Sequence, residues 1–309
     1  MRNEIIYDKT GRPDIMVTFT PDELGLPAEL NGRAVKEYCI SKYQNTLIDG
    51  VPHSLPYMEP ATKIDHDEAI RLCESKGEGW HLMTNDEWAA ITLKAWEDDT
   101  IPTGNTSFGK SHSHPEQHGT VCKYGMTLTG SGPIEWNHDR TQLGIADMVG
   151  NILEHVGGIR FLNGQVQTIP NHGAAAGADQ SENSSEWQPI LTKDGKPIYY
   201  NPQDGGIVLQ DHEAEDKDWD GTPFDNLEAE CDVPDQLIKL GLYPPEGLET
   251  ENFFWVDNDG ETIVVRGGYW NDGTGAGLFY RDGNNARSGT NTNIGFRSAY
   301  VRYSDDLTI

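Results

Sequence analysis

The chain has 309 residues, a formal net charge of −27 at pH 7 and an isoelectric point near 4.5. This charge repels nucleic-acid phosphates and anionic lipid headgroups, so it argues against binding to nucleic acid or to a membrane surface. No apolar run is long enough to span a bilayer, and no secretion signal is recognisable, so we expect no membrane insertion. A hydrophobic fraction of 36% is sufficient for a folded core, and we expect one domain.

The first half of the chain carries the firmest local signals. Residues 33–44 are rich in β-branched and aromatic side chains and predict a strand. Asp65 with Glu68 and Thr84 with Glu87 have the spacing of capping boxes, so each pair predicts the start of a helix. Apolar residues recur at helical spacing after each pair, which indicates that both helices pack on a core.

The middle of the chain is more polar. Residues 101–145 are rich in Gly, Ser and His and predict irregular surface structure, whereas 146–156 form a compact apolar segment. Residues 171–235 are polar and include the acidic run 211–220, which we interpret as a solvated insertion. A short helix is predicted at 234–244.

The C-terminal segment is the most informative part of the sequence. Two apolar runs, 262–265 and 294–301, predict strands that bracket a long stretch of Gly, Asn, Asp, Ser, Thr, Tyr and Arg. Such a stretch supplies turns and hydrogen-bonding or stacking side chains but little core, which is how a binding loop is built. Five apolar residues are spaced to pin this loop to a scaffold: Trp270, Ala276, Phe279, Ile294 and Phe296.

Three ordered motifs resemble a known family. Residues 79–90, residues 147–156, and ArgGlyGlyTyrTrp at 266–270 with GlyPheArg at 295–297 resemble the signatures of the formylglycine-generating-enzyme (sulfatase-modifying) type of C-type lectin fold. The resemblance implies an α+β fold with much irregular structure. It implies one domain at 35–302, with an N-terminal extension at 1–34, the insertion at 171–235, a variable ligand-binding region at 266–297 and a tail at 303–309.

Within that fold, the C-terminal segment resembles the variable region of proteins diversified by retroelements, including phage tropism determinants. Such systems mutate template adenines, so Asn codons become codons for Tyr, Asp, Gly, Thr, Ser, Ala or Arg. The resemblance implies ten varied, ligand-binding positions: Tyr269, Asp272, Thr274, Gly275, Tyr280, Arg281, Asp282, Gly283, Gly289 and Thr292. Four asparagines would be unmutated: Asn271, Asn284, Asn285 and Asn291. The alternative is an ordinary glycine-rich loop.

The function implied is recognition of a protein or glycan ligand on a cell surface by a non-enzymatic protein, located on a virion or a cell surface. No cofactor is required, and the oligomeric state stays open. Alternatives are a metal-dependent oxidoreductase of the same fold and a structural virion or surface protein. Thiol oxidation in this family resembles a copper reaction that needs two cysteines just before the GlyPheArg motif, and residues 232–309 contain no cysteine.

Two groups of residues are candidate metal ligands. His112, His114 and His118 have a spacing that can bind metal, but their Gly/Ser/Pro context favours exposed polar side chains. Asn151 and Glu154 lie in a motif that, in the resembled fold, is near a structural calcium ion, and their oxygens suit that cation. We favour the alternative, in which Asn151 satisfies a turn and Glu154 bonds buried backbone or Arg297.

Overall fold

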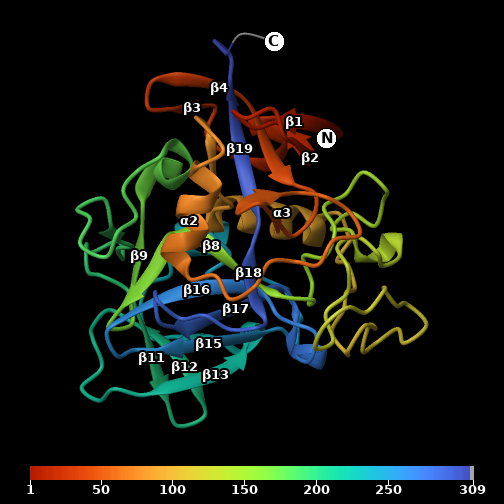
Figure 1. The fold of residues 1–309 in the computed structure, drawn as a ribbon. Helices are drawn as coiled ribbons and strands as arrows, with labels where there is room; N and C mark the ends of the chain where they lie inside the picture. Colours follow the sequence, from red (N-terminus) through yellow and green to blue (C-terminus); the bar gives the residue numbers. More distant parts are fainter. Residues whose placement is uncertain (307–309) are drawn as a thin grey trace.

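Two β-sheets with helices between them make up the structure, a computed structural model that describes residues 1–306. Figure 1 shows the smaller sheet at the top, the larger sheet at the bottom and the two main helices between them. The α+β class predicted from the sequence is confirmed. Within residues 1–306, no helix is long and apolar enough to cross a membrane.

The smaller sheet has six strands in the order β1-β2-β4-β19-β7, with β3 paired to β4. Its strands are β1 (Arg2–Tyr7), β2 (Pro13–Phe19), β3 (Glu29–Leu30), β4 (Arg33–Ser41), β7 (Trp80–Leu82) and β19 (Ser298–Tyr303). The predicted strand at 33–44 is confirmed as β4. Because β19 lies between β4 and β7, the last strand of the chain closes the sheet that the first strands begin.

The larger sheet has eleven strands and carries the C-terminal segment. Its main order is β13-β15-β17-β16-β8-β9-β11-β12-β14, with β10 paired to β9 and β18 paired to β8. Its strands are β8 (Leu153–Leu162), β9 (Gln165–Thr168), β10 (Gln188–Pro189), β11 (Tyr199–Gln203), β12 (Gly206–Gln210), β13 (Trp219–Pro223), β14 (Glu228–Ala229), β15 (Phe253–Asp257), β16 (Glu261–Gly267), β17 (Gly277–Asn285) and β18 (Ile294–Phe296). A separate hairpin pairs β5 (Thr46–Ile48) with β6 (Val51–His53).

The two predicted helices are confirmed as α2 (His66–Glu74) and α3 (Asn85–Glu97). At α3 the capping box is complete: the Thr84 hydroxyl accepts the Glu87 N–H at 3.1 Å, and the Glu87 carboxylate accepts the Thr84 N–H at 2.8 Å. At α2 only half of the box forms, because Asp65 caps the helix while Glu68 pairs with Arg71 instead. The predicted helix at 234–244 is the shorter α4 (Asp235–Lys239), and α1 (Pro21–Leu24) is a single turn.

Three 3₁₀ turns, η1 (Ile134–Trp136), η3 (Phe224–Asn226) and η4 (Gly273–Gly275), and the longer η2 (Pro170–Ala176) complete the regular structure. The stretch 101–145 otherwise holds only isolated bridges and turns, as its composition predicted.

Three boundary predictions are wrong. Residues 1–34 are not an extension, because β2 pairs with β4 and buries Met16, Val17 and Phe19. Residues 171–235 are not a solvated insertion, because they supply β10 to β14 and buried core side chains, although much of the acidic run 211–220 is exposed. The predicted tail at 303–309 begins inside β19, and residues 307–309 lie outside the described part of the chain.

The predicted strand at 294–301 is two strands in different sheets. β18 joins the larger sheet and β19 the smaller one, and Arg297 stands between them. The fully buried Arg297 guanidinium donates to Glu154 at 2.5 and 2.7 Å and to the carbonyls of Ser41 and Ala146. One side chain therefore ties together the two sheets at the point where the chain passes between them.

Candidate ligand-binding face

The centre of the predicted variable region is a strand rather than a loop. Residues Gly277–Asn285 form β17 inside the larger sheet, parallel to β15 and antiparallel to β16. Successive side chains of a strand point to opposite faces. Phe279, Arg281 and Gly283 therefore face the core, whereas Tyr280 and Asp282 face the other side of the sheet.

Two of the ten predicted ligand-contacting positions are wrong for this reason. Arg281 is 0% exposed, and its guanidinium lies 4.1 Å from the centre of the Phe224 ring. Gly283 is buried so tightly that an added Cβ would lie 2.2 Å from a ring carbon of Phe161. Neither position can touch a ligand at the surface.

The outward face of the sheet gathers aromatic residues that sequence reasoning missed. Trp255 on β15 stands beside Asp282 in the register, and its ring covers Gly221 on the neighbouring strand β13. The ring centroid of Trp255 lies 5.1 Å from that of Phe253 and 6.0 Å from that of Trp219. Trp219 is 60% exposed. The run of aromatic and β-branched residues from Phe253 to Val256 was a usable strand signal.

Tyr269 and Asp272 extend this face from the turn that precedes β17. The Tyr269 N–H donates to the Asp272 carboxylate at 2.9 Å, which fixes the turn. Tyr269 packs with Tyr280, Phe253 and Trp255 in one apolar cluster. We call the set Trp219, Phe253, Trp255, Tyr269, Asp272, Tyr280 and Asp282 the aromatic–acidic face. Tyr280 is 4% exposed, so it supports the face from beneath.

The two carboxyl groups of this face are poorly solvated. Burial raises the pKa of Asp272 to about 7, and the nearby Asp282 adds to the shift. Burial raises the pKa of Asp282 to about 6, against the opposing hydrogen bond from the Asn284 N–H. Near neutral pH these groups can therefore both accept and donate hydrogen bonds, which suits a polar ligand rich in hydroxyl or amide groups.

The remaining predicted positions lie apart from this face. Exposed Thr274 lines a cleft formed with 101–113 and 248–252, and Gly275 follows it in the same turn. Gly289 and Thr292 lie in the connection between β17 and β18, where the Asn291 carbonyl accepts the Lys63 N–H. Of the four asparagines, Asn271 and Asn291 are exposed, whereas Asn284 and Asn285 are half-buried.

The predicted burial of the five apolar anchor residues is confirmed. Trp270, Ala276, Phe279, Ile294 and Phe296 are all buried. Trp270 packs with Met126 and Ile152, and an added Cβ on Gly125 would lie 2.5 Å from its ring. The turn at 269–276 is therefore held to the irregular 101–145 region.

Most of the candidate metal ligands make contacts with other protein groups. His112, His114 and His118 are exposed; His112 bonds the Thr106 hydroxyl and His114 approaches Glu116. The Asn151 side-chain oxygen accepts hydrogen bonds from Thr127 and Asn105, and its amide nitrogen donates to Gln44. Both Glu154 oxygens accept Arg297 donors, and one also accepts from Gln44. These protein donors occupy the oxygens that calcium would need, so the alternative pairing of Glu154 with Arg297 is correct.

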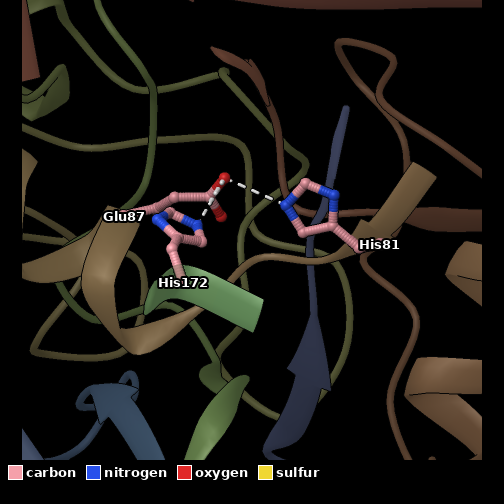
Figure 2. Close-up of side chains that lie close together, drawn as sticks. All are labelled: His81, Glu87 and His172. Carbon is pink, nitrogen blue, oxygen red and sulfur yellow. Dashed lines mark hydrogen bonds and ion pairs between the residues drawn. The ribbon is translucent and has the colours of Figure 1, made fainter. Parts of the chain in front are cut away.

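A different buried cluster is formed by His81 on β7, Glu87 on α3 and His172 on η2 (Figure 2). The Glu87 carboxylate points between the two imidazoles, 2.9 Å from His81 Nε2 and 3.7 Å from His172 Nε2. His81 Nδ1 lies 3.0 Å from the Gly79 carbonyl. Because both nitrogens of His81 face acceptors, the ring needs two N–H groups, which an imidazolium has and a metal ligand lacks. The cluster is therefore a buried ion pair that fixes the start of α3.

No protein-family model and no curated protein matches this chain. Among solved structures, PvdO from Pseudomonas aeruginosa is 16% identical, with 98% of this chain and 99% of PvdO covered and a TM-score of 0.40. Treponema denticola variable protein 1 is 11% identical, with 97% and 99% covered and a TM-score of 0.36. A Major Tropism Determinant, the U1 variant, is 11% identical, with 97% and 72% covered and a TM-score of 0.31. At these identities and TM-scores the similarity identifies neither a substrate nor a partner for this chain.

Proposed function

We propose that this chain is a non-enzymatic ligand-binding protein that recognises a protein or glycan on a cell surface through the aromatic–acidic face. The observation that supports this most directly is the run of neighbouring aromatic rings from exposed Trp219 through Trp255 to Phe253, flanked by Asp282. Exposed apolar patches with polar neighbours are typical of interaction sites. The protein would act on a virion or a cell surface and would require no cofactor.

The chemistry of this face suits recognition. Tyr and Trp supply large, rigid contact areas at low entropic cost, and they are the commonest binding hot spots. Asp272 and Asp282 add hydrogen-bonding groups whose raised pKa values reduce their charge near neutral pH. A glycan, which stacks sugar rings on aromatics and bonds carboxyls through hydroxyls, and a polar protein surface both fit this combination.

We further propose that retroelement-driven adenine mutagenesis diversifies this face. Tyr269, Asp272 and Asp282 can change without altering the core-facing side of β17, whereas Arg281 and Gly283 cannot. Sequencing the DNA beyond the 3′ end of the gene tests this proposal. We expect a near-identical repeat beside a reverse-transcriptase gene, with adenine-specific differences at codons 269, 272 and 282 and none at codons 281 and 283. Differences spread evenly over both faces of β17 would contradict selective diversification.

The binding role is tested with a double variant, Trp219→Ser with Tyr269→Ser. We expect fluorescent wild-type protein to bind members of a glycan array or a panel of intact cells, and the double variant to lose at least tenfold in affinity because two aromatic contacts are removed. The matched control is Tyr7→Ser with Tyr57→Ser, since these tyrosines are 62% and 63% exposed and are not part of this face. Equal loss in both variants, or undiminished binding by the first, would place the binding site elsewhere.

The rival function is a metal-dependent oxidoreductase. Cys39 and Cys73 are buried, and burial raises the pKa of the Cys39 thiol to about 12, so these thiols are poor metal ligands at neutral pH. Copper-loaded protein incubated with a cysteine-containing sulfatase peptide should leave the peptide unchanged. Conversion of the peptide cysteine to an aldehyde would overturn the non-enzymatic assignment.

A further inference from the structure

Two arginines lie side by side in the core of the larger sheet. Arg266 on β16 and Arg281 on β17 are direct partners in the antiparallel register, so their side chains leave the same face of the sheet. Both are fully buried. Burying a single unpaired charge is costly, and burying two of the same sign together costs more.

No carboxylate in residues 1–306 pairs with either guanidinium. Arg266 makes one long hydrogen bond, from Nη2 to the Leu278 carbonyl at 3.4 Å. No hydrogen-bond partner among the described residues is found for Nε and Nη1 of Arg266. The same is true of all three guanidinium nitrogens of Arg281. The two other fully buried cationic side chains of residues 1–306 are paired: Arg297 with Glu154, and Lys76 with Asp14 at 2.7 Å. Among the fully buried arginines and lysines of residues 1–306, only Arg266 and Arg281 therefore lack a carboxylate partner.

Aromatic rings account for part of the stabilisation. The guanidinium carbon of Arg281 lies 4.1 Å from the ring centroid of Phe224 and 5.0 Å from that of Phe254. The guanidinium carbon of Arg266 lies 5.8 Å from the ring centroid of Trp88. Such contacts stabilise a desolvated cation, because the ring face carries partial negative charge. They accept no N–H hydrogen bond in the plane of the guanidinium, so the donors stay unmatched.

The two guanidinium groups converge on one place, above Gly241. The backbone of Gly241 has a φ of +58°, and the position of an added Cβ would be 3.7 Å from Nη2 of Arg266 and 3.7 Å from Nη2 of Arg281. The atom nearest to that Cβ position is the methyl carbon of Ala89, at 3.5 Å. Because residue 241 is glycine, no side chain stands between these two nitrogens and the Gly241 backbone.

We propose that Arg266 and Arg281 together bind one small monovalent anion, of the size of chloride, beside Gly241. The anion neutralises part of the paired positive charge and accepts N–H groups from both guanidiniums. The close Ala89 methyl and the surrounding aromatic rings exclude a phosphate or sulfate ester. Bound there, the anion ties β16 to β17 from the core side, directly behind Tyr280 and Asp282. This site does not depend on the proposed function.

Crystals grown in sodium bromide provide the direct test. Bromide replaces chloride and scatters anomalously, so we expect an anomalous difference peak in contact with both guanidinium groups. Water or continuous protein density at that position, without an anomalous peak, would overturn the proposal. This measurement uses wild-type protein and does not depend on whether any variant folds.

Thermal melting provides the second test. Because the chain carries a charge of −27, any salt screens self-repulsion, so chloride must be compared with gluconate at constant ionic strength. An anion that binds only the folded state should raise the wild-type melting temperature by roughly 3 to 8 °C between 1 and 300 mM chloride. Arg281→Met should abolish this response, whereas Arg71→Met, at an exposed arginine paired with Glu68, should keep it.

The outcomes are distinct. A wild-type melting temperature equal in chloride and gluconate would overturn the proposal. If Arg281→Met does not fold, Arg281→Lys preserves the charge but loses the forked donors, and its chloride response should be weakened. A full response in Arg281→Lys and in Arg266→Lys alike would also count against a site built from both guanidiniums.

Discussion

Trp270 holds the turn before β17 with one side chain. Its indole is buried against Met126 and Ile152, and it lies so close to Gly125 that only glycine fits there. We expect Trp270→Ala to lower the free energy of unfolding by about 3 to 5 kcal/mol, measured by urea denaturation, because it leaves a large cavity. The matched control is exposed Trp219→Ala, which should change it by no more than about 0.5 kcal/mol. Equal effects would show that Trp270 is not an anchor.

Asp272 should make stability depend on pH. Burial raises its pKa from an ordinary value of 3.8 to about 7. The protonated folded state is therefore favoured, and this contribution is complete below about pH 3.8 and lost as the pH rises through about 7. Asp272→Asn removes the ionisation, so it should gain stability relative to wild type between pH 5 and pH 8 in urea titrations. Exposed Asp204→Asn is the control, and it should show no such pH-dependent gain.

Glu87 is the centre of the buried ion pair at the start of α3. Burial acts to raise its pKa, but the imidazoles of His81 and His172 outweigh burial and lower it. Its contribution to stability is therefore present above its ordinary value of 4.5 and lost as the pH falls further. Glu87→Gln should cost about 3 to 5 kcal/mol at pH 6, because it leaves buried positive charge unpaired. Exposed Glu97→Gln, at the other end of α3, should cost little, and a comparable loss there would contradict this role.

At the scale of the element, the alternation of β17 separates side chains of the aromatic–acidic face from side chains of the core. Gly283→Ala should lower the free energy of unfolding by about 1 to 3 kcal/mol, because its methyl group would overlap the Phe161 ring. Asp282→Asn, one residue earlier and on the other face, should cost less than about 0.5 kcal/mol and should affect ligand binding instead. Urea denaturation of the two variants side by side checks this. Equal destabilisation would mean that the two faces are not distinct.

This alternation could not be predicted from the local sequence. A capping residue such as Thr84 bonds a residue only three positions away, and a large apolar side chain such as Trp270 is usually buried. Both features can be read from the local sequence, and the predictions based on them are confirmed. In β17, Gly, Asn and Asp dominate, and these residues have low strand propensity. The strand exists because β15 and β16 supply hydrogen-bonding partners on both sides. Trp219 and Trp255 were missed because their position on the same face as Asp282 depends on pairing between distant segments.

At the scale of the whole molecule, the chain closes on itself. Both ends contribute to the smaller sheet, where β2 and β19 flank β4, and Figure 1 shows the N-terminus and β19 at the same end of the molecule. Arg302 on β19 pairs with Glu4 on β1 and with Glu37 on β4, which links the first, fourth and last strands of residues 1–306. Residues 171–235 also join segments that are distant in sequence, because their strands β10 to β14 belong to the larger sheet. The stability of the aromatic–acidic face therefore depends on contacts between segments far apart in sequence.

Removal of the N-terminus tests this closure. Deletion of residues 1–20 takes away β1 and β2 and the fully or nearly fully buried side chains of Met16, Val17 and Phe19. Burial of each such side chain is worth roughly 1.5 to 3 kcal/mol, and domains are stable by only about 5 to 15 kcal/mol in total. We therefore expect the truncated chain to lose cooperative thermal unfolding. Deletion of residues 1–12 removes only β1, whose one buried core side chain is Ile6, and should lower the melting temperature while keeping the transition cooperative. A cooperative transition at the wild-type temperature after the longer deletion would restore the interpretation of residues 1–34 as a dispensable extension.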